Sequence, residues 1–146
     1  MSGQLLRLLL ADDEPLALRR LRLALQAMPH VEIVGAASDG AQAIEAMRQL
    51  RPDVVLLDVR MPLANGFEVA SAVDAAGGPE IIFVSAFDAY ALQAFETAAV
   101  DYLVKPVEFE RLAAALSRAR ARGADKNAGR RAAELTSVIE ALRRES

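Results

Sequence analysis

The sequence of 146 residues contains no cysteine and no tryptophan, and it has a single histidine. Without thiols, neither a disulfide framework nor a thiolate metal site can form. The histidine, His30, follows Met28 and Pro29 in an expected loop and has no second ligand or triad partner nearby in the sequence. We therefore interpret His30 as a surface residue rather than a metal ligand or a catalytic base.

Long hydrophobic runs and an excess of positive charge are also missing. No apolar stretch approaches the roughly 18 residues of a membrane span. The short run at 5–11 is interrupted by Arg7 and lacks the basic flank and cleavage site of a signal peptide. The formal net charge of −3 argues against a dedicated nucleic-acid surface in this chain. We expect a cytoplasmic protein with no membrane partner.

What the chain does contain is a regular alternation of short apolar runs and amphipathic stretches. The apolar runs, which we interpret as strands, lie at 5–11, 32–36, 54–57, 81–84 and 100–104. Most of them lack polar alternation, as expected for parallel strands that are buried on both faces. Five βα repeats predict an α/β fold, a flavodoxin-like (βα)5 three-layer sandwich with the parallel sheet order 2-1-3-4-5.

Helices are expected between these strands. They are predicted to begin near Pro15, after the capping signal Ser38-Asp39-Gly40 and after Asn65-Gly66, and to span about 88–97 and 108–120. The third should stop at Gly77. In the first helix, four apolar residues are expected to face the sheet: Leu16, Leu21, Leu25 and Met28.

The character of the sequence changes after Arg122. Residues 123–129 are polar and bounded by glycines, which predicts a linker between a domain at 1–122 and a C-terminal helix at 130–146. This helix carries aliphatic residues at spacings typical of one helical face: Leu135, Val138, Ile139 and Leu142. Two roles stay open for it. It packs on its own domain, or it is a signalling or dimerisation helix that leads to a missing output domain.

Polar groups recur where the predicted strands end. Asp12 and Asp13 follow the first strand, Asp58 follows the third, Ser85 follows the fourth and Lys105 follows the fifth. Because the carboxyl ends of parallel strands share one edge of the sheet, we expect these groups to converge. Carboxylate oxygens suit Mg²⁺, which needs only one to three of them because it keeps several waters.

The same groups suit the transfer of a phosphoryl group. Asp58 ends the most buried predicted strand and is the candidate nucleophile, because a carboxylate that attacks phosphorus forms an aspartyl phosphate. Lys105 is the candidate phosphate partner, and Ser85 can donate a hydrogen bond to a phosphate oxygen. We expect a cis peptide bond before Pro106, which would aim Lys105.

Residues 4–120 resemble the receiver domain of two-component response regulators. The matching segments are 11–14, 57–62 with Gly66, 84–86 and 102–106. The segments at 85–95 and 99–106 are similar to the LytTR branch, whose members carry a C-terminal β-rich DNA-binding domain.

This resemblance implies a phosphorylation-dependent switch. Asp58 would accept a phosphoryl group from a sensor histidine kinase, and Ser85 and Tyr102 would be the hydroxyl and the aromatic of the switch. Mg²⁺ would be held by four groups: the carboxylates of Asp12, Asp13 and Asp58 and the backbone carbonyl of Arg60.

The resemblance also implies partners. A homodimer would form through the face of the fourth helix, fifth strand and fifth helix, and DNA would be bound only through an output domain. For Tyr102, plain half-buried packing stays open beside the switch role. A stand-alone receiver acting through protein contacts is the alternative function.

A third class, an aspartate-nucleophile hydrolase, needs a second acid two residues after the nucleophile, where this chain has Arg60. We therefore expect no enzyme beyond self-phosphorylation and slow autodephosphorylation. The slowness is our hypothesis, because the bulky Arg60 and the apolar Phe87 occupy positions from which polar residues can orient the attacking water.

Overall fold

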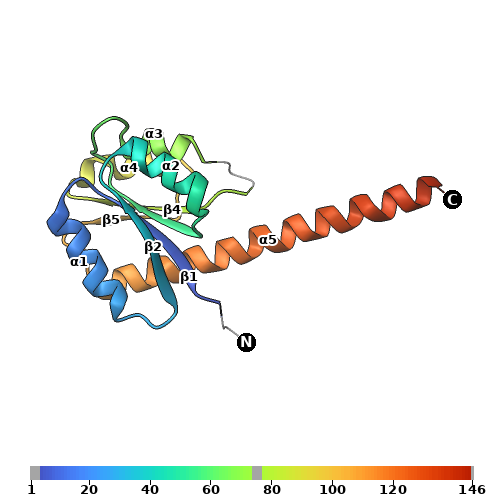
Figure 1. Cartoon of the computed structure of the whole chain (residues 1–146), viewed down its shortest axis with the longest axis horizontal. Helices are drawn as coiled ribbons and strands as arrows, with labels where there is room; N and C mark the ends of the chain where they lie inside the picture. Colours follow the sequence, from blue (N-terminus) through green and yellow to red (C-terminus); the bar gives the residue numbers. More distant parts are fainter. Residues whose placement is uncertain (1–3, 74–76, 146) are drawn as a thin grey trace.

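The computed structural model describes residues 4–73 and 77–145 as five strands surrounded by helices (Figure 1). The strands and helices follow one another along the chain as β1 (Leu6–Ala11), α1 (Pro15–Gln26), β2 (Val31–Ala37), α2 (Gly40–Leu50), β3 (Val54–Leu57), α3 (Gly66–Ser71), β4 (Glu80–Ser85), η1 (Asp88–Tyr90), α4 (Ala91–Phe95), β5 (Asp101–Val104) and α5 (Phe109–Glu145).

All neighbouring strands of the sheet are parallel, and their order is β2-β1-β3-β4-β5. The predicted fold class and sheet order are therefore confirmed. The ends of β1 and β3 are also joined beyond the regular pairing, since the backbone N–H of Asp58 donates to the carbonyl of Ala11 at 2.9 Å. This order places the two central strands, and the acidic residues that follow them, side by side.

Successive apolar side chains along the strands point to opposite faces of the sheet, so a hydrophobic core forms on each face. Leu8 and Leu10 pack with α1 and α5, whereas Leu9 and Ala11 pack with the helices of the opposite face. Figure 1 shows the resulting three layers, with α1 and α5 on one side and α2, α3 and α4 on the other. The four residues of β3 are all buried, as expected for a central parallel strand.

Helix starts follow the local signals of the sequence. Asp39 caps α2 by accepting a hydrogen bond from the Gln42 N–H at 2.8 Å, and Asn65 and Glu68 form a capping box at α3. Gly66 allows a close approach, because a Cβ there would lie 2.3 Å from the backbone carbonyl of Asp58. The start of α3 is thus held directly against the end of β3.

Some predicted boundaries were wrong. The third helix is α3, which ends at Ser71, and the fourth is divided into the 3₁₀ turn η1 and the short α4. The third helix was predicted to continue up to Gly77, and residues 74–76 of that stretch lie outside the described residues. Leu16 is 57% exposed, so it does not face the sheet as predicted, whereas Leu21 and Leu25 are buried.

The linker predicted at 123–129 is helical. A single helix, α5, runs for 37 residues from Phe109 to Glu145, and its second half projects away from the sheet (Figure 1). The prediction of an interruption was therefore wrong, although the four aliphatic residues at 135–142 do lie in a helix and are exposed. Among the described residues, no helix combines the length and apolar character that crossing a membrane requires.

Candidate functional site

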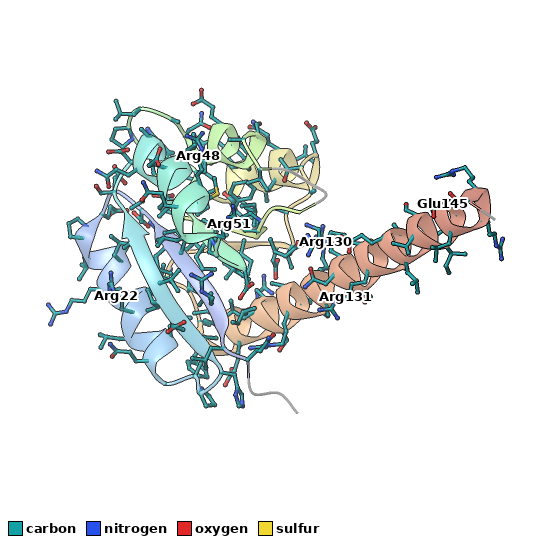
Figure 2. The ribbon with its side chains drawn as sticks, turned by 45° about the vertical axis from the view of Figure 1, so that its right-hand side comes forward. Arg22, Arg48, Arg51, Arg130, Arg131 and Glu145 are labelled. Carbon is teal, nitrogen blue, oxygen red and sulfur yellow. The ribbon has the colours of Figure 1, made fainter. Side chains whose placement is uncertain are left out.

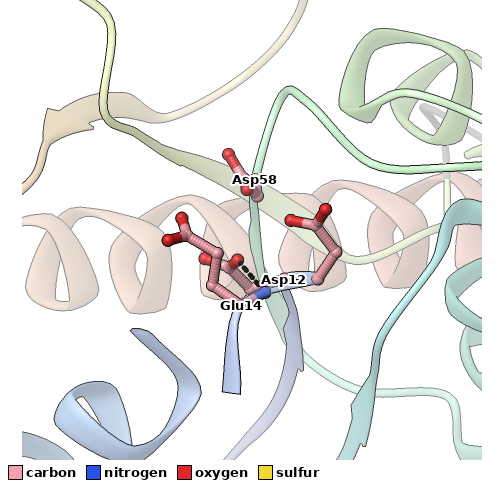
Figure 3. Close-up of side chains that lie close together, drawn as sticks. Asp12, Glu14 and Asp58 are labelled. Carbon is pink, nitrogen blue, oxygen red and sulfur yellow. Dashed lines mark hydrogen bonds between the residues drawn. The ribbon is translucent and has the colours of Figure 1, made fainter. Parts of the chain in front are cut away.

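The polar residues predicted from strand ends lie together at the carboxyl edge of the sheet. Asp12 follows β1 and Asp58 follows β3, and they are only 1% and 5% exposed. Figure 3 shows the side chains of Asp12, Glu14 and Asp58 close together at this edge. The backbone N–H of Glu14 donates a hydrogen bond to Asp12 Oδ1 at 2.9 Å, which holds the loop after β1 against the Asp12 side chain.

Lys105 supplies the positive charge of this site. Its Nζ lies 2.7 Å from Asp12 Oδ2, 3.2 Å from Glu14 Oε1 and 3.6 Å from Asp58 Oδ2. The Lys105 backbone N–H donates to the carbonyl of Ser85 at 2.8 Å, and the peptide bond to Pro106 is cis. One ammonium group therefore lies among three carboxylates that come from two different strand ends.

The acidic residues form a cluster that fits a divalent cation. Asp12, Asp13, Glu14 and Asp58 each offer a carboxylate oxygen, and these oxygens all lie within 4.8 Å of one another. Hard oxygen donors at a solvent-open sheet edge are what Mg²⁺ prefers. Arg60 and Asp13 also line one cavity of about 500 Å³ beside the cluster. The donor set therefore fits the predicted cofactor.

The electrostatics of Asp58 reflect its surroundings. Burial raises the pKa of Asp58 to about 7, and the neighbouring carboxylate of Asp12 adds to the rise, while Lys105 and the backbone N–H of Arg60 oppose it. Burial alone would lower the pKa of Lys105, but its contacts with Asp12, Asp58 and Glu14 raise it above the ordinary value. Without a bound cation, Asp58 is therefore a carboxyl group whose charged form is disfavoured.

Ser85 and Tyr102 meet at one backbone segment. Ser85 is fully buried, and its Oγ accepts a hydrogen bond from the Phe87 N–H at 3.1 Å. The Tyr102 hydroxyl donates to the Phe87 carbonyl, and the ring of Tyr102 packs on Phe83 with centroids 6.3 Å apart. Burial raises the pKa of Tyr102. The two candidate switch residues are thus linked through both backbone polar groups of Phe87.

Arg60 and Phe87 also lie against each other. The Arg60 guanidinium is 5.0 Å from the centre of the Phe87 ring, a cation–π contact. Phe87 contacts Tyr90 edge to face at 6.1 Å as well. The loop after β3 and the loop after β4 therefore touch through these side chains.

Glu14 is the member of the site that sequence reasoning missed. Sequence reasoning included Glu14 only within the matching segment 11–14, yet its side chain contacts Lys105 and belongs to the acidic cluster. The available signal was its position as the third acid in the run Asp12, Asp13 and Glu14. Its side chain is 63% exposed, so it is the most exposed of the three carboxylates that contact Lys105.

The response regulator receiver domain model matches residues 8–117 of this chain. The chain belongs to the receiver domain family of response regulators. Receivers are signalling domains of the two-component type rather than metabolic enzymes, so the family does not favour the hydrolase interpretation. The sheet order and the flanking helices are those of the receiver fold.

The receiver is also similar to individual proteins. It is 46% identical over 116 residues to the transcriptional regulatory protein BtsR of Salmonella typhi, covering 80% of this chain and 48% of the relative. The corresponding protein of Escherichia coli (strain K12) is 45% identical over 116 residues, again with 80% and 48% covered. The chain thus spans about half the length of the curated relatives it matches.

A solved structure is similar over nearly its whole length. The signal receiver domain of NarL from Mycobacterium tuberculosis is 35% identical, with a TM-score of 0.74, and the match covers 81% of this chain and 98% of that one. The response regulatory domain of mrkE from Klebsiella pneumoniae gives the same TM-score at 28% identity, covering 82% and 98%. In both comparisons, almost all of the residues left unmatched are residues of this chain.

Proposed function

We propose that this receiver accepts a phosphoryl group on Asp58 from the phosphohistidine of a sensor histidine kinase. The observation that carries the proposal is the placement of one buried carboxylate, Asp58, within the acidic cluster and 3.6 Å from the ammonium of Lys105. Such surroundings suit a carboxylate nucleophile, because phosphoryl transfer is catalysed mainly by positioning and electrostatic stabilisation.

In the proposed reaction, an ionised Asp58 oxygen attacks phosphorus and a new O–P bond forms. The N–P bond of the donor breaks, and its electron pair stays on the histidine ring. Lys105 contacts the transferred group as a point charge, for which it gives up part of its pairing with Asp12 and Glu14. Ser85 donates its hydroxyl hydrogen to a phosphate oxygen.

Asp12, Asp13, Asp58 and the backbone carbonyl of Arg60 would hold Mg²⁺. When bound, this cation supplies positive charge that offsets the phosphate oxygens. Its three carboxylate ligands would come from the cluster of converging oxygens. Glu14 lies within the same cluster and is a further candidate for an indirect contact through water.

The test is treatment with a small phosphodonor and Mg²⁺, followed by intact-mass measurement. Wild type should gain one phosphoryl group, and Asp58→Asn should gain none. The control is Asp39→Asn, a half-buried capping position at which asparagine is equally suitable. A mass gain in Asp58→Asn equal to that of wild type would refute the assignment.

We propose that Ser85 and Tyr102 convert phosphorylation into a change of surface. Movement of the Ser85 hydroxyl toward the phosphate removes the acceptor of the Phe87 N–H, and Phe87 also holds the Tyr102 hydroxyl. A shift at Ser85 therefore reaches Tyr102 through one residue. The affected face, α4, β5 and α5, is the proposed homodimer surface.

This face carries ion pairs that a dimer would have to keep or exchange. Arg111 and Arg118 of α5 both contact Asp101 of β5 within the same chain. Sedimentation of phosphorylated and unphosphorylated protein tests the dimer. Phosphorylation should shift the wild-type protein toward dimer, and a monomer in both states would contradict this step.

We propose that the receiver, with its boundary near residue 122, controls a LytTR-type DNA-binding output domain in a cytoplasmic transcription regulator. Supporting this, the curated relatives named transcriptional regulatory proteins are about twice as long as the matched region. The alternative is a stand-alone receiver. Reading the complete gene separates them: a β-rich domain encoded after α5 supports the regulator, and a stop codon there supports the alternative.

A further inference from the structure

A buried carboxylate lies at the sheet edge opposite the phosphorylation site. Glu80 begins β4 and is 3% exposed. Its Oε1 lies 3.2 Å from Arg122 Nε, and its Oε2 contacts Lys126 Nζ. Both cations come from α5 and are one helical turn apart, so they face the same side of the helix.

These ion pairs lie where apolar packing of α5 has ended. Ala119 is buried, but none of the residues at 120–145 is. A cavity of about 780 Å³ lies there, lined by Met47 and Arg51 on one side and by Gly123 and Asn127 on α5. Packing therefore cannot hold this part of α5 against the domain, and polar contacts have to do so.

The polar contacts of this segment are few. Arg120 donates to the carbonyls of Gln4 and His30, and Arg122 donates to the carbonyl of Ala98 at 2.9 Å as well as facing Glu80. Arg130 still lines the cavity beside Gly77, and Figure 2 shows the later part of α5, toward Glu145, extending clear of the sheet.

Of these contacts, the one at Glu80 is the farthest along the helix and the only one among them made to a buried charge. Uncompensated burial of a carboxylate is strongly unfavourable, so Glu80 requires its cations. It can keep both only if α5 stays helical through Gly123 to Lys126. This requirement explains why the predicted linker is helical despite its glycines.

Glu80 and Ser85 are the two ends of one strand. All six residues of β4 are buried, so the strand is packed on both faces. The switch hydroxyl at one end and the carboxylate that holds α5 at the other are therefore joined by a short, tightly packed segment.

We propose that Glu80 is a positioning residue that, through Arg122 and Lys126, fixes the direction in which α5 leaves the receiver. It is also the point at which a displacement of β4 reaches the helix, a second step that rests on the proposed phosphorylation of Asp58. No part of this role involves contact with the phosphoryl group.

Pulsed electron paramagnetic resonance tests the direction of α5. Because the chain has no cysteine, Ala41→Cys on α2 and Ser137→Cys on α5 give two unique spin-label positions. We expect a narrow distance distribution in the labelled parent and a broad one in Glu80→Gln and in Lys126→Gln. Arg131→Gln, which removes a cation from the projecting part of the same helix, should stay narrow.

Hydrogen exchange supplies a second readout that does not depend on the core. Lys126→Gln leaves every strand residue intact, so it keeps the test decisive even if Glu80→Gln fails to fold. We expect the amides at 120–130 to exchange about tenfold faster in Lys126→Gln, the change given by loss of one charge-assisted contact. A narrow distribution and unchanged exchange in Lys126→Gln would overturn the proposal.

A small phosphodonor with Mg²⁺ then separates the two steps. If the parent gains a phosphoryl group and its distance distribution shifts, while Glu80→Gln gains the group without a shift, both steps are supported. If the parent gains the group without any shift, the transmission through β4 is refuted. If it gains no group, phosphorylation of Asp58 is refuted, while the result on helix direction stands by itself.

Discussion

Replacing the Asp58 carboxyl by a neutral amide should stabilise the folded protein, and the effect should grow with pH. The pKa of Asp58 is raised from 3.8 to about 7 by burial and by Asp12. Above the unfolded pKa the unfolded chain has lost its proton while the folded chain retains it, so stability falls as pH rises from about 4 to 7. Asp58→Asn has no proton to lose and avoids this decline.

The size of the effect follows from the same pKa. At 1.36 kcal/mol per pKa unit, a rise from 3.8 to about 7 corresponds to a ceiling of about 4 kcal/mol. This ceiling already includes the attraction of Asp58 to Lys105, whose Nζ lies 3.6 Å from Asp58 Oδ2. We therefore expect Asp58→Asn to exceed wild type by about 2 to 4 kcal/mol at pH 8 without divalent cations, and by about 1 kcal/mol or less at pH 4.5.

Urea unfolding at pH 4.5 and pH 8 measures this difference, with equal m-values showing that only stability has changed. Asp39→Asn is the matched control, because it removes a half-buried acid outside the cluster and keeps the cap of α2. If Asp58→Asn is no more stable than wild type at pH 8, the burial of an unfavourable charge at Asp58 is refuted.

Three further predictions concern the metal, the lifetime of the phosphate and the helix. Mg²⁺ should raise the melting temperature of wild type more at pH 8 than at pH 5, because protons compete for the ligand carboxylates. Asp13→Asn should reduce this rise in melting temperature. An equal rise in the variant would remove Asp13 from the ligand set. Phe87→Glu should shorten the lifetime of the phosphorylated protein, because it places a polar group where Phe87 packs on Arg60. The lifetime is measured by following the mass of the phosphorylated protein over time. Phosphate loss from wild type within seconds, or an equal lifetime in the variant, would contradict slow autodephosphorylation. Gly123→Ala and Gly129→Ala should each stabilise α5 by about 1 kcal/mol, since a Cβ at either position meets nothing within 4 Å; lower helicity by circular dichroism would show that these glycines are required.

The central features of the fold could be predicted because they follow local rules. Apolar runs without alternation marked β3 and β4 as buried parallel strands, and the βα alternation predicted a doubly wound sheet. The order 2-1-3-4-5, now confirmed, was chosen among doubly wound orders because it places the first and third strands side by side. Asp12, Asp58 and Lys105 could be placed together because parallel strands end at one edge. Confirmation of the sheet order therefore also explains their proximity.

The errors arose where tertiary contacts outweigh local signals. Glycines at 123 and 129 are typical of a linker, but two cations of α5 pair with Glu80, which is more than forty positions earlier in the chain. No local pattern at 123–129 contains that contact. The same reason hid Glu14, whose partner Lys105 lies 91 positions away.

The misplacement of Leu16 has a geometric cause. Leu16 is five residues before Leu21, and at about 100° per residue it lies about 140° around the helix from Leu21. Leu21 and Leu25 are buried, whereas Leu16 is 57% exposed. Apolar character alone thus assigned a residue to the core that helical periodicity places elsewhere.

The most direct test of the central claim is to identify the phosphorylated residue itself. Protein treated with a small phosphodonor and Mg²⁺ would be reduced with borohydride, which converts an acyl phosphate into a stable alcohol, and its peptides mapped by mass. We expect the modification at Asp58 and at no other acid. Modification at Asp13 or Glu14 instead, with Asp58 unmodified, would contradict the assignment of the nucleophile.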